Sequence, residues 1–137
     1  MIYLDTCAVA KLARRERETE ELFDWLDLHG DEELVSSVLL EIELERALRR
    51  VDAAALSRIP RILSGITRIE LNADIRVLAG AYQDPLLRSL DAIHLATAQS
   101  VVASAGTQLS TFVTYDKRLI AAARAEGLNV EHPGARY

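Results

Sequence analysis

Short apolar runs alternate along the chain with longer stretches in which apolar residues recur every three to four positions. The first pattern is typical of β-strands and the second of helices packed on one side. The apolar runs predict strands within residues 2–4, 34–36, 66–71, 109–114 and 129–131. The periodic stretches predict helices over residues 7–13, 19–28, 37–51, 52–63, 73–81, 90–105 and 116–126.

Residues at the ends of these stretches support several of the predicted boundaries. Asp5 and Thr6, Asn72 and Ser89 each stand where a helix N-cap is expected, and Gly127 stands just beyond the last helix. Pro60 interrupts the stretch 52–63, so the pattern does not fix where that helix ends.

The order of the predicted elements indicates an α/β fold. Strands alternate with helices, and the connections are too long for hairpins, which favours a parallel sheet covered by helices on both faces. With 137 residues and no linker or repeat, the chain is expected to form a single domain over residues 1–137.

Composition narrows the choice of compartment. The chain has a single cysteine, Cys7, which excludes an internal disulfide framework and favours the reducing cytoplasm. We expect Cys7 itself to be a small buried residue. Residues 92–115 contain no Asp, Glu, Lys or Arg, but their several polar residues and Gly106 argue against a membrane span.

The balance of charges limits the possible ligands. The chain has 21 Asp and Glu residues against 16 Lys and Arg, a net charge of −5. Because nucleic-acid binding normally relies on a basic field, either nucleic acid is not the ligand or the acids gather where a metal ion neutralises them.

Several acids lie where such a metal site is expected. Ligands of parallel sheets bind at the carboxyl ends of the strands. Asp5 follows the first strand, Asp116 follows the fourth, and Asp91 opens the long helix. The helix after the second strand is a fourth element that can contribute a carboxylate, from Glu41 or Glu43. Such oxygen ligands suit Mg²⁺ or Mn²⁺.

Each of these acids also has a simpler interpretation. Asp5, Asp91 and Asp116 stand at helix starts, where acids usually cap the helix or interact with its dipole. Helical spacing does not decide between Glu41 and Glu43, because the two flank the apolar stripe on opposite edges.

Histidine and basic residues give weaker indications. His94 follows Asp91 by three residues, and we expect it to be bonded locally within its helix. Basic residues cluster in two helices, where they either form solvated faces or contact RNA phosphates or an acidic partner. They are Lys11, Arg14, Arg15 and Arg17 in one cluster and Arg46, Arg49 and Arg50 in the other.

Four blocks of the sequence resemble the PIN-domain ribonucleases, specifically the VapC-type toxins of bacterial toxin–antitoxin pairs. The first reads IYLDT at 2–6, and the second runs from SS at 36–37 to ELERA at 43–47. The third reads LRSLDAIHLATA at 87–98, and the fourth reads FVTYDKRL at 112–119. The third block is highly specific, the first and fourth moderately so, and the second is weak alone. The blocks keep the family's order and together span nearly the whole chain.

The resemblance implies a fold and a site. It implies a three-layer α/β/α PIN-like fold with a short parallel sheet of four to five strands. Its register selects Glu43 over Glu41, so the implied catalytic and metal-binding residues are Asp5, Glu43, Asp91 and Asp116. Thr6 and Thr114, which lie beside two of these acids, are expected to support them.

The implied activity is that of a type II toxin. A metal-dependent endoribonuclease would hydrolyse RNA with a water activated by Mg²⁺ or Mn²⁺, mainly on Asp5 and Asp91. Glu43 would complete the cluster or act as general base, and Asp116 would hold a second metal or a metal-bound water. A small antitoxin partner and a homodimer are also implied.

Other α/β functions fit the sequence less well. A haloacid-dehalogenase-type phosphatase needs Asp-x-Asp after the first strand, where this chain has Asp5-Thr6-Cys7. A phospho-accepting receiver domain needs an Asp after the third strand, where the chain reads Glu70-Leu71-Asn72. The main alternative is a catalytically silent PIN-like module that binds RNA or a protein partner.

Overall fold

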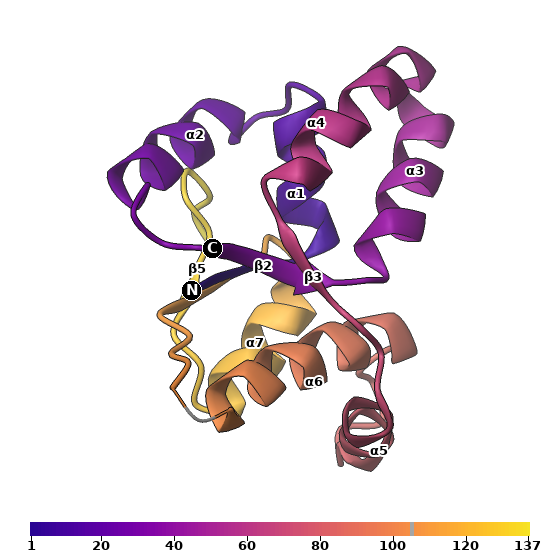
Figure 1. Ribbon diagram of the computed structural model, residues 1–137, viewed down its shortest axis with the longest axis vertical. Coiled ribbons are helices and arrows are strands. Elements are labelled where there is room, and N and C mark those ends of the chain that lie inside the picture. The colour runs from indigo at the N-terminus through magenta and orange to yellow at the C-terminus, as the bar shows by residue number, and fades with distance from the viewer. Residues whose placement is uncertain (105) are drawn as a thin grey trace.

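A five-stranded, fully parallel sheet forms the middle of the molecule (Figure 1). The computed structural model describes residues 1–104 and 106–137. The sheet has the order β3-β2-β1-β4-β5. Its strands are β1 (Ile2–Leu4), β2 (Leu34–Ser37), β3 (Thr67–Ile69), β4 (Thr111–Val113) and β5 (Val130–Glu131). All five predicted strands are present, with β3, β4 and β5 shorter than their predicted ranges.

Helices cover both faces of this sheet. They are α1 (Thr6–Ala13), α2 (Thr19–Leu28), α3 (Leu40–Val51), the 3₁₀ helix η1 (Ala53–Arg58), α4 (Ile59–Ser64), α5 (Ala73–Ala81), α6 (Ser89–Ala103) and α7 (Lys117–Ala125). Figure 1 shows α1 to α4 on one side of the sheet and α5, α6 and α7 on the other. The predicted three-layer α/β/α fold is therefore confirmed.

The central strand β1 supplies side chains to both cores. Ile2 and Leu4 are fully buried in the core under α1 and α3, whereas Tyr3 is fully buried in the opposite core. There the Tyr3 ring stacks on Phe112 of β4, with ring centroids 5.1 Å apart. The alternation follows from the strand period of two, because successive side chains point to opposite faces.

Some predicted helix boundaries were wrong. The single helix expected over 52–63 is two elements, η1 and α4, because Pro60 lacks an N–H and is accommodated at a helix start. Ser37 ends β2 instead of opening α3. Ser89 is the first residue of α6 and not its N-cap, which is Arg88. That helix ends at Ala103, and its predicted last residue, 105, lies outside the described residues.

Other boundaries agree with the prediction. Asn72 caps α5 through a hydrogen bond from Ile75 N to its side-chain oxygen. Gly127 follows α7 with a φ of 82°, the left-handed conformation that glycine adopts without strain. Within residues 1–104 and 106–137, every helix is too short or too polar to span a lipid bilayer.

The strand order determines where a ligand can bind. From β1 the chain proceeds to β2 and β3 on one side, then returns to β4 on the other side of β1. The crevice beyond the carboxyl ends of β1 and β4 lies at this change of direction, which is the usual ligand site of open parallel sheets.

Candidate active site

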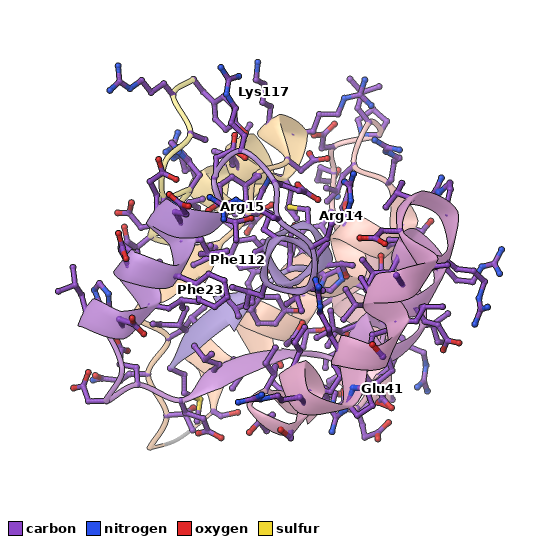
Figure 2. The ribbon with its side chains drawn as sticks, turned by 90° about the horizontal axis from the view of Figure 1, so that it is seen from above. Arg14, Arg15, Phe23, Glu41, Phe112 and Lys117 are labelled. Atoms are coloured by element: carbon purple, nitrogen blue, oxygen red, sulfur yellow. The ribbon has the colours of Figure 1, made fainter. Side chains whose placement is uncertain are left out.

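A pocket of about 460 Å³ lies beyond the carboxyl ends of β1 and β4. Besides Glu16, its lining includes the carboxylates of Asp5, Glu43, Asp91 and Asp116, which come from four separate parts of the chain. The four acids selected by the resemblance are thus brought to one place. Glu41 lines a different hollow, together with Arg68 and Glu70. In Figure 2, Glu41 lies toward the opposite side of the view from Lys117, the residue that follows Asp116.

Asp5 is held in a fixed orientation at the end of β1. It caps α1, because Oδ1 accepts a hydrogen bond from Ala8 N at 3.1 Å and another from Cys7 Sγ at 2.9 Å. Its second oxygen, Oδ2, accepts from Thr114 Oγ1 at 2.6 Å. The residue is only 4% exposed, and this burial raises the pKa of its carboxyl despite the opposing effects of His94 and the hydrogen bonds.

The Cys7 thiol helps to hold the Asp5 side chain in place. Besides donating to Asp5, its sulfur accepts a hydrogen bond from Tyr115 N at 3.2 Å. Burial, together with the nearby Asp5 charge, raises the pKa of the thiol well above its usual value. Since the thiolate is the reactive form, Cys7 is not an activated nucleophile.

Asp116 is also a helix cap. Its Oδ1 accepts from Leu119 N at 2.9 Å at the start of α7, and its own N–H donates to Thr114 Oγ1 at 3.2 Å. Thr114 therefore links Asp116 to Asp5. The capping interpretation of these two acids is correct, and it does not conflict with their position in the pocket.

Asp91 differs from these two acids because it lies in the first turn of α6 without capping it. Burial, followed by the charges of Asp116 and Asp5, raises the pKa of its carboxyl. Three carboxylates at this end of the sheet are therefore close enough to oppose one another's ionisation. An adjacent cation would relieve that repulsion.

Glu43 extends from α3 into the same pocket and is anchored through one oxygen. Its Oε1 accepts from Thr6 Oγ1 at 2.9 Å and lies 2.6 Å from His94 Nε2. The other ring nitrogen of His94, Nδ1, is 2.7 Å from the Tyr3 hydroxyl. The expectation that His94 is bonded locally was wrong, because its partners Tyr3, Glu43 and Thr6 all lie more than fifty residues away in the sequence.

The chemistry of the pocket fits a hard divalent cation. The structure, which describes all but one residue, contains no preformed group of three or more His, Cys, Asp or Glu side chains able to hold a metal ion. Mg²⁺ does not require such a cage, because it usually retains several waters and binds one or two carboxylates plus substrate phosphates. Asp5 and Asp91, which both line this pocket, are carboxylates of the type that such an ion binds.

The predicted cationic contacts differ in how firmly their side chains are held. Lys11 lines the pocket but is only 8% exposed, and its ammonium is 2.9 Å from Glu16 and 2.8 Å from Glu18. Burial lowers the pKa of Lys11, but the hydrogen bonds to Glu18 and Glu16 outweigh this effect and raise it overall. Lys11 is therefore already neutralised within the fold.

The arginines are closer to solvent. Arg15 pairs with Glu20, Arg14 is 3.9 Å from both Glu16 and Asp52, and Arg49 pairs with Glu45 at 2.9 Å. The side chains of Arg46 and Arg50 are exposed on α3. Neither Arg14 nor Arg15 is among the described residues that line the pocket.

Comparison with known proteins places these features in a family. The sequence matches the PIN domain over residues 2–125. It is 48% identical over 134 residues to Ribonuclease VapC35 of Mycobacterium tuberculosis, covering 98% of each chain. It is 38% identical over 138 residues to Ribonuclease VapC47 of the same species, again covering 98% of each chain.

Solved structures show the same fold at lower sequence identity. The toxin–antitoxin complex VapBC2 from Rickettsia felis, bound to a promoter DNA fragment, contains a chain that matches with a TM-score of 0.72 and 19% identity, covering 97% of this chain and 99% of that one. The Mycobacterium tuberculosis toxin VapC20, which cleaves the sarcin–ricin loop, matches with a TM-score of 0.70 and 16% identity, covering 89% and 95%. With a family match over almost its whole length, the chain belongs to the PIN-domain family, and its relatives within that family include VapC ribonucleases.

Proposed function

We propose that this chain is a metal-dependent endoribonuclease that acts as the toxin of a type II toxin–antitoxin pair. The observation that carries the proposal is that Asp5, Glu43, Asp91 and Asp116 all line one pocket at the carboxyl ends of β1 and β4. The near-full-length similarity to Ribonuclease VapC35 supports RNA as the substrate.

In this proposal Mg²⁺ or Mn²⁺ is held mainly by Asp5 and Asp91, with Glu43 and Asp116 completing the acidic set. A bound divalent cation would lower the pKa of a water and offset the negative charge that develops on the phosphate. Asp5 contributes a carboxylate whose orientation is fixed, because Ala8, Cys7 and Thr114 all donate to it. Thr6 and Thr114 support Glu43 and Asp5, respectively.

The acidic net charge is compatible with an RNA substrate under this proposal. A cation among the carboxylates converts a pocket that would repel phosphate into one that attracts it. Arg14, Arg15, Arg46, Arg49 and Arg50 are then available to guide the RNA backbone or to contact an acidic partner, and Lys11 would have to leave its glutamates to do so. Cleavage is therefore expected to be strongly dependent on salt concentration.

The proposal also includes a protein partner and a compartment. Solved structures with this fold include toxin–antitoxin complexes from Rickettsia felis and Klebsiella pneumoniae, which supports a small antitoxin as partner. The family resemblance further suggests a homodimer. The cytoplasm, where both RNA and an antitoxin are accessible, is the proposed location.

The test is cleavage of total bacterial RNA by the purified chain in Mg²⁺, Mn²⁺ or EDTA. Discrete fragments that need the metal are expected from the wild type and to be lost in folded Asp5→Asn and Asp91→Asn variants. Losing several kcal/mol of charge stabilisation slows cleavage by about a hundredfold or more. Cleavage that persists after thorough chelation, or at the wild-type rate in Asp5→Asn, would contradict the proposal.

A matched pair of variants in α3 tests the choice of glutamate. Glu43→Gln is expected to reduce cleavage strongly, whereas Glu41→Gln, which alters a side chain lining a different hollow, leaves it unchanged. Metal binding without cleavage of any RNA would instead favour the catalytically silent binding module.

A further inference from the structure

A chain of hydrogen bonds connects the centre of the sheet to the pocket. It begins at the Tyr3 hydroxyl, 2.7 Å from Nδ1 of His94, and continues from Nε2 of His94 to Oε1 of Glu43 at 2.6 Å. The three residues come from β1, α6 and α3, so the connection passes from one helical layer to the other. The proposed chemistry in the pocket does not itself use Tyr3 or His94.

The buried end of this series of hydrogen bonds, at Tyr3, is held rigidly by packing. Tyr3 is fully buried, its ring stacks on Phe112, and it meets the His94 ring edge-on with centroids 5.9 Å apart. His94 is only 2% exposed. This packing shields the Tyr3 hydroxyl from water and holds it within hydrogen-bond distance of Nδ1 of His94.

At the other end of this series of hydrogen bonds, His94 contacts a single oxygen of Glu43. A carboxylate accepts only, so the His94 Nε2 must carry the hydrogen of that bond. Thr6 Oγ1 donates to the same Oε1 at 2.9 Å. Both hydrogen bonds that the described residues make to this side chain reach Oε1, which fixes the carboxylate plane and leaves Oε2 for a ligand in the pocket.

We propose that Tyr3 and His94 are positioning residues that hold Glu43 so that its second oxygen faces a bound divalent cation. This inference rests on the proposed function, because it assumes that the pocket binds such a cation. His94 hydrogen-bonds to the proposed ligand Glu43, and Tyr3 hydrogen-bonds to His94, so together they orient a side chain that would itself contact the metal. Removing such partners typically weakens metal affinity or activity about 10- to 100-fold.

Binding of Mn²⁺ to the metal-free chain, measured by calorimetry, tests the inference without relying on cleavage. Tyr3→Phe deletes only the hydroxyl and retains the stacking on Phe112. We expect it to weaken Mn²⁺ binding about tenfold or more. The control is Tyr82→Phe, which removes another tyrosine hydroxyl, one bonded to Gln99 away from the pocket, and leaves Mn²⁺ affinity unchanged. Wild-type affinity in Tyr3→Phe would overturn the inference.

A double-mutant cycle separates positioning from general destabilisation. If Tyr3 acts through Glu43, then adding Tyr3→Phe to a Glu43→Gln variant weakens Mn²⁺ binding no further, because the side chain being positioned is already altered. An equal loss in both backgrounds would show that the hydroxyl acts on the fold as a whole and would overturn the assignment.

Substitutions of His94 supply an independent arm if Tyr3→Phe does not fold. His94→Gln retains an N–H that can reach Glu43, whereas His94→Leu has no donor. We expect His94→Gln to bind Mn²⁺ more tightly than His94→Leu when both are folded by circular dichroism. Equal affinities in the two variants would contradict the positioning role.

Failure of the proposed function gives a different result. A wild-type chain that neither binds Mn²⁺ nor cleaves RNA overturns both proposals. A wild-type chain that does both, with Tyr3→Phe indistinguishable from it, overturns only the positioning role of Tyr3 and His94.

Discussion

Asp5 and Thr114 lie 109 residues apart in the sequence and are joined by a hydrogen bond of 2.6 Å from the threonine hydroxyl to Oδ2 of the aspartate. The same hydroxyl oxygen accepts a hydrogen bond from Asp116 N. One buried threonine thus fixes the relative positions of the carboxyl ends of β1 and β4, where the pocket lies.

Thr114→Val is expected to lower both stability and cleavage. The valine has the same shape but neither donates to Asp5 nor accepts from Asp116, and leaving buried polar groups unpaired costs about 1–3 kcal/mol of unfolding free energy. Urea denaturation measures the loss. The control is Thr111→Val at the start of β4, since the only hydrogen bond of its hydroxyl to a described residue is a long one, 3.5 Å, from Asn129 Nδ2. An equal loss in both variants would contradict a special role for Thr114.

Asp91→Asn is expected to stabilise the metal-free protein while abolishing cleavage. Burial and the charges of Asp116 and Asp5 oppose ionisation of this carboxyl, so removing its charge removes a destabilising interaction. Thermal denaturation in EDTA measures the change in Tm. Asp24→Asn, an exposed position in α2, is the control and is expected to have little effect. A lower Tm for Asp91→Asn would contradict this account.

The stability difference between wild type and Asp91→Asn is expected to depend on pH. The folded-state pKa of Asp91 is raised above the unfolded value of 3.8, so the folded chain takes up this proton first as pH falls. The wild type should therefore be less stable than the variant at neutral pH, and the difference should shrink as pH falls through the folded-state pKa and vanish below about 3.8. Denaturation of both chains across this range measures it, and a constant difference would exclude Asp91 as its source.

Addition of Mg²⁺ or Mn²⁺ is expected to raise the Tm of the wild type. A ligand that binds only the folded state stabilises it by about 2.7 kcal/mol at one hundred times its dissociation constant. The effect should be much smaller in Asp5→Asn, which lacks a proposed ligand, and should remain in Glu41→Gln, whose substitution is outside the pocket. An identical rise in all three chains would indicate that the metal binds elsewhere.

Lys11→Gln is expected to destabilise the chain. The lysine side chain is about one-tenth exposed, and its loss leaves Glu16 and Glu18 facing each other without their cation. We expect a cost of about 2 kcal/mol, between the values for exposed and fully buried ion pairs. Urea denaturation measures the cost, with the exposed Lys117→Gln as the control. A stable Lys11→Gln with impaired RNA binding would instead indicate a direct phosphate contact.

Much of the fold could be predicted from the sequence because its signals are local. Short apolar runs and helical periodicity, together with caps such as Asn72 and Asp116, predicted every strand and most helices. The prediction was wrong at 52–63, because the pattern does not show that a 3₁₀ helix, η1, comes first and that α4 begins only at Ile59, just before Pro60.

The site was predictable only in part. Position after a strand identified Asp5 and Asp116, but helical spacing did not separate Glu43 from Glu41, and only the resemblance made that choice. The hydrogen bonds of His94 to Tyr3 and Glu43 could not be predicted, because they join residues 91 and 51 positions apart and local sequence patterns do not report such contacts. Tyr3 lies between Ile2 and Leu4 in an apolar run, and this pattern predicts only that it is a core residue.

Asp5 and Asp116 each begin a helix as well as facing the pocket, whereas Asp91 caps nothing. Replacing an N-cap typically costs about 0.5–2 kcal/mol of stability. Selection for stability would therefore retain both caps even in a descendant of this chain that no longer cleaved RNA. It would have no such reason to keep Asp91, whose charge the fold opposes. Among chains of this type, an aspartate at position 91 is therefore better evidence of an active enzyme than one at position 5.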